Sequence, residues 1–415
     1  MHRSIIELFS SSFLGRIIGL IRFQVVLFVF GQNILSDSII YFTAFIWLVN
    51  NFFVIPSVNS SLIADLGAND QDQHVMIIQN LVKRISKLAI FIGIMSLIIV
   101  VFLNTNKGIL NLDIISICLI LMTFPLLGIN EIFSLYNQYK EKYFLYSFNP
   151  AVWNSVLIVG LFFYWHFDLE DLWFYFLFLL IAKILTVTIQ FKYSKLKLTW
   201  GKGDNEVKKT EKSEGNHNIF YNFAIIIFSG ISFFDLNILS IYSVVGAVTV
   251  YTIFLKIPSL LQTIVTSSTL PVFFNRIVLK QATLVKSIMQ FVGLTLLLFL
   301  GIAVVYLIMG KWLFSIFFNY ELTEIDIADI YLSLLYMLVS TLSFFLIRLS
   351  VEYKYQKIIF VSSVLAVIIK LTATQLYVVD IRNLLLVNII VFGIIFITGI
   401  FLIFKKNKSN ESLTA

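Results

Sequence analysis

Charged residues are scarce in this sequence. Asp, Glu, Lys and Arg together make up 13% of its 415 residues, about half of their share in an ordinary soluble domain. Hydrophobic residues make up 59%, and 42 residues are phenylalanine. A soluble protein of this length could not bury so much apolar surface in one core, so lipid must solvate most of the chain. The composition therefore excludes an ordinary soluble protein and indicates a membrane protein.

Cysteine and histidine are also scarce. The single cysteine, Cys118, has no partner for an intramolecular disulfide or a cysteine metal cluster. The four histidines (His2, His74, His166 and His217) lie in or beside loops and contain no His-x-x-x-His pair. The sequence has no nucleotide-binding glycine loop and no polar segment long enough for a catalytic module. We expect no enzymatic activity, no metal and no cofactor.

Long apolar runs dominate the rest of the sequence. A spanning helix needs about 20 largely apolar residues, and twelve segments meet that requirement. They cover residues 5–30, 37–60, 86–103, 111–135, 148–166, 172–191, 218–241, 245–272, 285–309, 326–348, 356–378 and 382–404. These runs predict an all-α polytopic membrane protein with about 12 transmembrane helices.

A polar segment with seven lysines, residues 192–217, separates the first six runs from the last six. We expect it to be a cytoplasmic linker between an N-terminal six-helix bundle, residues 1–191, and a C-terminal six-helix bundle, residues 218–415. Residues 41–62 and 251–270 both begin with tyrosine and end with a serine-leucine or serine-threonine-leucine stretch. Such a weak internal repeat is typical of two pseudo-symmetric bundles around a central cavity.

The basic residues predict the orientation. With the N-terminus in the cytoplasm, 22 of the 30 Lys and Arg residues fall in cytoplasmic segments or at the cytoplasmic ends of spans, three fall in external segments or at external span ends, and five lie deeper inside spans. Lys and Arg are enriched on the cytoplasmic side of membrane proteins, so we expect both termini in the cytoplasm. The net charge of +7 then reflects topology, and we expect no binding to nucleic acid.

Two arginines lie inside the first apolar run. Arg16 and Arg22 are six residues apart, which places them about 120° apart around a helix and about 9 Å apart along it. A charge inside a span is costly unless it faces a partner or a water-filled cavity. Arginine suits phosphate because its planar guanidinium donates two parallel hydrogen bonds and stays charged. We predict that both arginines line a cavity; snorkelling to the surface or pairing with a carboxylate remains an alternative for Arg16.

A stripe of small residues accompanies these arginines. Ser11, Gly15 and Gly19 are spaced by four residues, which places them on one side of a helix. Small residues at this spacing allow a neighbouring helix to approach closely. We therefore predict that this stripe packs tightly against another helix.

Three acidic residues are candidates for ion coupling or charge pairing. Asp235 lies in the middle of its span, where a carboxylate either couples to an ion or pairs with a cation. Asp37 stands at the external start of the second span, where the alternative is a helix N-cap. Glu131 lies near the cytoplasmic end of the fourth span and is within reach of water.

Three lysines also lie within spans. Lys256 precedes Pro258, which removes a backbone hydrogen bond and can kink the helix; we treat Lys256 as a candidate substrate-binding residue. Lys183 and Lys370 have stems long enough to carry their ammonium groups to the membrane surface. Each of the two could therefore snorkel, and the sequence does not assign a role to either.

The first sixty residues resemble a known family. The resemblance is carried by Ser-Phe-Leu-Gly-Arg-Ile-Ile-Gly-Leu-Ile-Arg at 12–22, Phe-Gly at 30–31 and Ser-Asp-Ser-Ile-Ile-Tyr-Phe-Thr-Ala-Phe at 36–45. These stretches are similar to the opening of the MviN/MurJ family of the multidrug/oligosaccharidyl-lipid/polysaccharide exporter superfamily. Residues 234–277 resemble the seventh and eighth helices of both MurJ-like and Wzx-like flippases.

The resemblance implies a function and a set of site residues. Arg16 and Arg22 match the cavity arginines of the family, and Asp37 matches its acidic residue in the second helix. The sequence departs from the family at Asn50, where an arginine is frequent, and Lys256 stands near another missing arginine. Twelve spans are usual for Wzx-like proteins, whereas MurJ proteins usually have fourteen. Both lipid II and a surface-polysaccharide repeat unit therefore remain possible substrates.

The family likeness implies a monomeric flippase in the bacterial inner membrane. Its substrate would be a saccharide linked to undecaprenyl diphosphate, carried by alternating access with the polyprenyl tail in membrane lipid. An ion gradient, through a coupling cation, or the membrane potential would drive transport. The alternative is an ion-coupled multidrug or metabolite exporter of the same superfamily, which would need an acidic cavity. Five basic residues against about three acidic ones in or beside the spans favour an anionic substrate.

Overall fold

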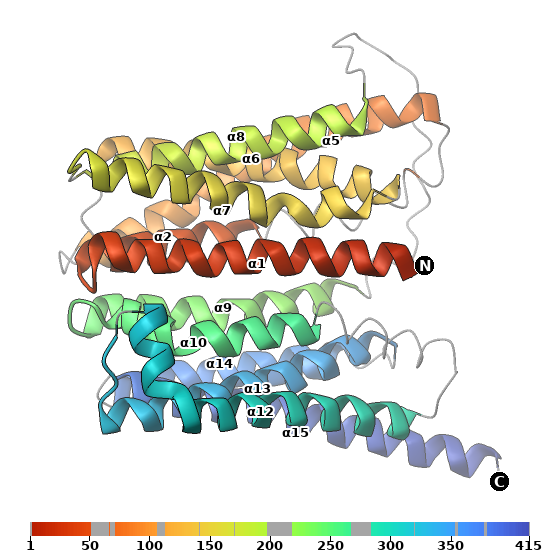
Figure 1. Cartoon of the computed structure of the whole chain (residues 1–415). Coiled ribbons are helices and arrows are strands. Elements are labelled where there is room, and N and C mark those ends of the chain that lie inside the picture. The colour runs from red at the N-terminus through yellow and green to blue at the C-terminus, as the bar shows by residue number, and fades with distance from the viewer. Residues whose placement is uncertain are drawn as a thin grey trace. The chain divides into compact units, whose positions relative to one another are not determined.

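The protein is all-helical in a computed structural model (Figure 1). The structure describes residues 2–50, 66, 71–105, 113–140, 142–169, 171–196, 218–266, 284–318, 320–352, 356–376 and 380–414. Twelve helices and no strand occur in these ranges. The chain divides into two compact units, Met1–Ser213 and Glu214–Ala415. The predicted fold class is confirmed.

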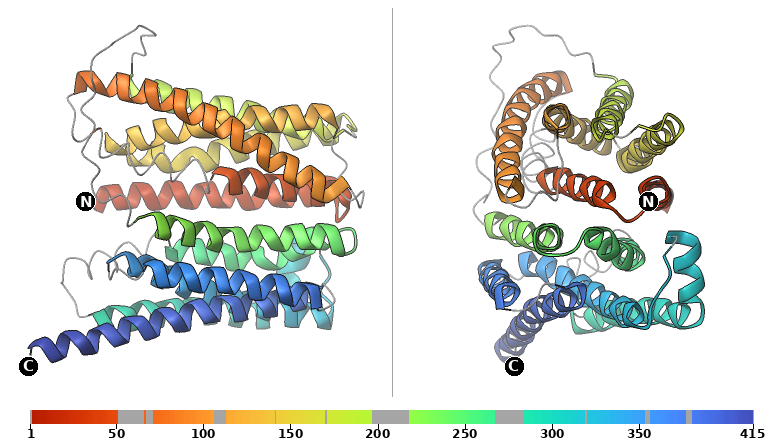
Figure 2. Two further views of the ribbon diagram at one scale, coloured as in Figure 1. Left: turned by 180° about the vertical axis from the view of Figure 1, so that it is seen from behind. Right: turned by 90° about the vertical axis from the view of Figure 1, so that its left-hand side faces the viewer.

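The first unit consists of six helices: α1 (His2–Phe30), α2 (Ile34–Val49), α5 (Gln71–Thr105), α6 (Ile114–Tyr139), α7 (Tyr143–His166) and α8 (Trp173–Ser194). Helix α1 packs along α7, and α6 packs against both α5 and α8. Helix α7 also contacts α8 (Figure 2). Residues of α1, α6, α7 and α8 are thereby brought close together.

The second unit also consists of six helices: α9 (Asn218–Tyr242), α10 (Ala247–Ile264), α12 (Leu284–Phe318), α13 (Glu324–Glu352), α14 (Gln356–Leu376) and α15 (Ile381–Thr414). Helix α13 contacts each of the other five. Its apolar span is 67% buried, whereas the other candidate spans of the chain are at most 39% buried. Helix α13 is therefore the central helix of this unit.

The twelve helices correspond one to one with the twelve predicted spans. Eight of them are long and apolar enough to cross a membrane, and α2 and the Phe233–Tyr242 part of α9 are shorter apolar helices. Large side chains face outward on these helices; Leu307, Ile308 and Ile397 each expose more than two thirds of their surface. Large exposed apolar surfaces of this kind are typical of proteins in contact with lipid.

Several predicted boundaries are wrong. Helix α5 begins at Gln71 instead of residue 86, because its charged first part is helical but too polar to register as an apolar run. Helix α12 continues through Phe318, past the predicted end of its span at residue 309. Helix α8 runs through Ser194, into the predicted linker, and residues 197–217 of that linker lie outside the described residues. The linker and domain boundaries stay predictions.

The small-residue stripe of α1 packs against α7. A β-carbon on Gly15 would stand 3.0 Å from Pro150 Cβ and 3.2 Å from the backbone nitrogen of Ala151. One on Gly19 would stand 3.2 Å from Nδ2 of Asn154. That Nδ2 donates hydrogen bonds to the carbonyl oxygens of Pro150 at 2.7 Å and Gly15 at 3.4 Å. The predicted tight packing is confirmed at both glycines, and it fixes α1 against α7.

Candidate functional site

A tryptophan in the first unit has two cations close to its ring. The guanidinium carbon of Arg22, on α1, lies 4.9 Å from the ring centroid of Trp153, on α7. The ammonium nitrogen of Lys183, on α8, lies 4.5 Å from the same centroid. A cation within about 6 Å of an aromatic face is attracted by the ring's negative quadrupole, by about 2 kcal/mol when both are desolvated. Trp153 therefore holds two positive charges near each other despite their repulsion.

The arginines of α1 retain unused hydrogen-bond donors. Nε and Nη1 of Arg22, and Nε of Arg16, are enclosed by protein and have no hydrogen-bond partner among the described residues. Buried polar atoms are normally satisfied, and each unsatisfied one calls for an explanation. In the part of the chain that the structure describes, neither arginine forms an ion pair with a carboxylate. These donors are available to a ligand.

Glu131 partly offsets the positive charge of this cluster. It lies on α6, partly buried, and interacts electrostatically with Lys183. Lys183 therefore has both an acidic neighbour, Glu131, and a basic neighbour, Arg22. The role of Lys183 was left open by the sequence, and the structure places its ammonium group on the ring of Trp153.

Asp37 is not a helix cap. The N-cap of α2 is Asn33, whose Oδ1 accepts hydrogen bonds from the backbone N–H groups of Leu35 and Ser36. The Ser36 hydroxyl oxygen accepts from the Asn33 N–H in return. Asp37 follows as a buried residue of the first helical turn, where a carboxylate is favoured by the positive end of the helix dipole. The N-cap alternative is therefore wrong.

Amide side chains join the three helices that carry Glu131, Trp153 and Lys183. Asn137 Nδ2 on α6 donates to Gln190 Oε1 on α8 at 2.6 Å. Gln190 Nε2 donates to Asn149 Oδ1 on α7 at 2.7 Å, and Asn149 Nδ2 donates to Ser134 Oγ at 2.7 Å. These hydrogen bonds link α6, α7 and α8, although Asn137 Oδ1 has no hydrogen-bond partner among the described residues. Nothing in the sequence marks these amides as partners.

The second unit contains a buried charge network. Asp235 on α9 forms an ion pair through Oδ1 with the ammonium group of Lys370 on α14. Its Oδ2 accepts hydrogen bonds from the Tyr251 hydroxyl on α10 at 2.6 Å and from Asn388 Nδ2 on α15 at 2.7 Å. Lys370 Nζ also donates to Asn388 Oδ1 at 2.8 Å and to the Ile231 carbonyl at 3.0 Å. All four side chains are at most 1% exposed.

This network answers two questions that the sequence left open. Asp235 was predicted to be an ion-coupling residue or the partner of a cation, and the structure pairs it with Lys370. Lys370, whose role the sequence left open, does not snorkel, because its side chain is buried among α9, α14 and α15. Tyr251 and Asn388 were missed as site residues. A tyrosine and an asparagine are too common in spans to be noticed without a known neighbour.

Lys256 lies on the same helix as Tyr251. It is partly buried, and its backbone carbonyl accepts a hydrogen bond from Ser259 Oγ at 2.8 Å. Pro258 lies inside α10, which continues to Ile264. The substrate-binding role of Lys256 stays a prediction.

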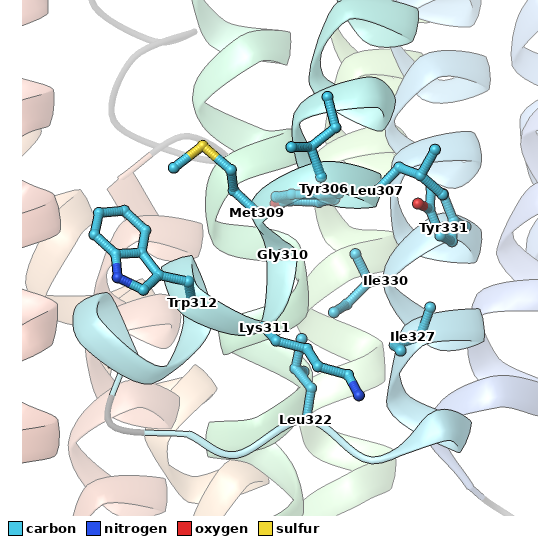
Figure 3. A pocket seen from close by; sticks show the side chains of 11 residues that line it. Tyr306, Leu307, Met309, Gly310, Lys311, Trp312, Leu322, Ile327, Ile330 and Tyr331 are labelled. Carbon is cyan, nitrogen blue, oxygen red and sulfur yellow. The ribbon is translucent and has the colours of Figure 1, made fainter.

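A cavity of about 350 Å³ lies in the second unit, between the end of α12 and the start of α13. Figure 3 shows α12 bending at Gly310, beside Tyr306 and Lys311, with Ile327 and Ile330 on the facing helix. Tyr320, near this end of the helices, has its pKa raised to about 12 by burial and by nearby Asp326. None of the predicted site residues lines the cavity.

Three lysines gather at one end of the first unit. Lys142 donates through its ammonium group to the carbonyl oxygen of Tyr193. Its pKa is lowered by burial and by repulsion from Lys195 and Lys140. All three lysines were assigned to the cytoplasmic side from the sequence, and the structure brings them together. The orientation of the chain in the membrane itself stays a prediction.

Comparisons with known proteins support the fold. No protein-family model matches the chain, and no curated protein matches it significantly. Among solved structures, the lipid II flippase MurJ in an inward closed conformation matches with a TM-score of 0.70 and 17% identity, covering 95% of this chain and 87% of that one. An outward-facing multidrug resistance MATE family transporter matches with a TM-score of 0.65 and 14% identity, covering 99% of this chain and 97% of that one.

A third structure belongs to the same superfamily. It is a transporter from Pyrococcus furiosus, described as having a binding pocket of reverse polarity, with a TM-score of 0.64 and 13% identity over 96% of this chain and 95% of that one. At these identities the likeness concerns the fold. The resemblance to MurJ-like transporters inferred from the first sixty residues is confirmed at that level.

Proposed function

We propose that this chain, which has the fold of MurJ and MATE transporters, is a flippase for a saccharide linked to a polyprenyl diphosphate. The saccharide is a surface-polysaccharide repeat unit or the peptidoglycan precursor lipid II. Transport runs from the cytoplasmic to the outer leaflet of a bacterial inner membrane. The two six-helix bundles alternate access to a cavity, and the polyprenyl tail stays in lipid.

The cation cluster of the first unit carries this proposal. Arg22 and Lys183 place two positive charges on one tryptophan, and Arg22 keeps two enclosed nitrogen atoms without hydrogen-bond partners among the described residues. A diphosphate offers several anionic oxygens at short spacing, which suits donors fixed on different helices. Each charge-assisted hydrogen bond to it contributes roughly 1.5–3 kcal/mol.

The remaining predicted residues take supporting roles in this proposal. Arg16 lies six residues before Arg22 and also has an enclosed nitrogen without a hydrogen-bond partner in the described ranges. Lys256 is a further candidate for binding the head group. Glu131 balances Lys183, and Asp37 is the remaining candidate for coupling to a cation. Asp235 serves in charge pairing, through Lys370.

A translocation assay with a lipid-linked oligosaccharide tests the proposal. Losing one charge-assisted hydrogen bond should weaken head-group binding about 10- to 150-fold, at roughly 1.4 kcal/mol per tenfold change. Arg22→Ala and Arg16→Ala should therefore abolish or severely reduce translocation. Arg22→Lys should retain only part of it, because an ammonium keeps the charge and loses the planar pair of donors.

A matched control is available in the second unit. Arg382 is 42% exposed and pairs with Asp329 through Nε at 2.8 Å, so Arg382→Ala removes an arginine that has a protein partner. It should leave translocation near the level of the unmodified protein. Protein abundance is measured for every variant. If the Arg16→Ala and Arg22→Ala variants both translocate normally, these arginines do not form the diphosphate site.

The second candidate function is an ion-coupled exporter of drugs or metabolites. It is favoured by the MATE structures, whose TM-scores of 0.62–0.65 are close to that of MurJ. Such a transporter for cations would need an unpaired buried carboxylate, whereas Asp235 is paired with Lys370. Efflux of a fluorescent cationic dye from cells that express the chain, abolished by Asp37→Asn at unchanged protein abundance, would favour the exporter.

A further inference from the structure

We propose that the oxygens around Lys370 form a monovalent-cation site that the protein fills with its own lysine ammonium. Lys370 then acts as a tethered cation, and the site takes no cation from solution. This inference concerns the second unit alone and does not depend on the flippase proposal.

The arrangement of the oxygens is the first argument. Lys370 Nζ contacts one carboxylate oxygen of Asp235, one amide oxygen of Asn388 and the backbone carbonyl of Ile231. A lysine ammonium has three N–H donors, and the three oxygens match them in number. Carboxylate, amide and carbonyl oxygens are also the groups that replace the water shell of a hard metal cation. The ammonium therefore occupies a position that is chemically suited to an alkali cation.

Burial is the second argument. Asp235 is fully buried and Lys370 is 1% exposed. A carboxylate in such a place needs a positive partner, since an uncompensated buried charge is strongly unfavourable. The carboxylate is also fixed from its other side, because Oδ2 accepts from Tyr251 and Asn388. Removing the lysine side chain would leave a rigid anionic site lined by oxygens, with space where the ammonium and its stem had been.

Asn388 links the two sides of the site. Its Oδ1 accepts from Lys370 Nζ, while its Nδ2 donates to Asp235 Oδ2 at 2.7 Å and reaches the Tyr251 hydroxyl at 3.3 Å. This bonding pattern fixes the amide orientation, with the oxygen facing the cation. A side chain held in this way is organised for a cation whether that cation is an ammonium or a metal ion.

Thermal stability in different salts tests the inference. The purified protein, Lys370→Ala, and the double variant Lys370→Ala with Asp235→Asn are melted in sodium, potassium or choline chloride at equal ionic strength. Lys370→Ala should gain a saturable rise of a few degrees in sodium or potassium over choline, because a ligand that binds only the folded state stabilises it. The unmodified protein and the double variant should show no such difference.

Two results would overturn the inference. One is a folded Lys370→Ala protein whose melting temperature is the same in all three salts. The other is a sodium- or potassium-specific rise in the melting temperature of the unmodified protein that Asp235→Asn removes. Such a rise would mean that a cation from solution already binds this carboxylate, and it can be measured even if Lys370→Ala does not accumulate. Neither measurement involves transport, so failure of the flippase proposal would leave both results interpretable.

Discussion

The charge pair Asp235–Lys370 allows a double-mutant cycle with a calculable outcome. Asp235→Asn leaves the ammonium of Lys370 without its charge partner in a site where both side chains are at most 1% exposed. Removing one member of a buried ion pair typically costs about 3–5 kcal/mol. Lys370→Met leaves the carboxylate uncompensated and should cost a similar amount. The double variant removes both charges, so its loss of folding stability should be well below the sum of the losses in the two single variants.

The melting temperature in detergent is the measurement. One kcal/mol corresponds to about 2–4 °C in a domain of 150–250 residues, so each single variant should lose on the order of 10 °C. The pair Asp329–Arg382 serves as control, because Arg382 is 42% exposed and exposed pairs typically contribute about 0.2–1 kcal/mol. A double-mutant cycle of Asp329 and Arg382 should therefore show little coupling between the two side chains.

The reasoning would be refuted by additivity at the buried pair. If Asp235→Asn with Lys370→Met lowers the melting temperature by the sum of the single effects, the two charges do not stabilise each other. An ion-coupling carboxylate without a lysine partner would tolerate substitution by Asn with little loss of stability. The ion pair with Lys370 predicts the opposite: Asp235→Asn is destabilised, and adding Lys370→Met costs much less than Lys370→Met alone.

Three further predictions concern packing, the tryptophan and topology. Gly15→Leu should force α1 away from Pro150 and destabilise the protein by about 1–3 kcal/mol, which lowers its melting temperature. Gly293→Leu should leave the melting temperature unchanged, because a β-carbon at Gly293 would meet nothing within 4 Å. Trp153→Ala should reduce translocation by about tenfold through loss of roughly 1–2 kcal/mol of cation–π attraction, and Trp153→Phe should keep most of it; equal activity of both variants would contradict this role. Reporter fusions at Lys202 and after Lys406 should report the cytoplasm and one at Asn319 the outside, and an external signal at Lys202 would disprove the predicted topology.

Hydropathy was sufficient to predict the helices, because each span needs its own run of apolar residues in lipid. It was less informative about their ends. The part of α5 before residue 86 is helical although it carries Lys83 and Arg84, and a helical segment with such charges leaves no long apolar run. Asp37 was considered as a cap because it is acidic and stands at the start of a span, yet Asn33 four residues earlier has the capping geometry.

The partners of the buried charges could not be predicted. Asp235 and Lys370 lie on α9 and α14, and a single sequence does not say which helices of a bundle are neighbours. The same holds for Arg22, Trp153 and Lys183, which come from three helices. The stripe of Gly15 and Gly19 predicted a close helix contact, but the identity of α7 as the partner came from the structure. Local spacing predicts which face of a helix packs, whereas pairing across helices depends on the tertiary fold.

The neutrality of the Asp235–Lys370 pair has an electrical consequence. A membrane voltage does work of about 2.3 kcal/mol per elementary charge per 100 mV on any net charge that crosses the field. An aspartate and a lysine that remain joined carry no net charge, so voltage cannot drive the second unit through them, however far its helices move. In the proposed flippase, an anionic head group that leaves the electrically negative cytoplasm would feel the full field. Any current of that flippase should then be carried by the substrate and by a cation bound elsewhere, and substitution of Asp235 and Lys370 together should leave its voltage dependence unchanged.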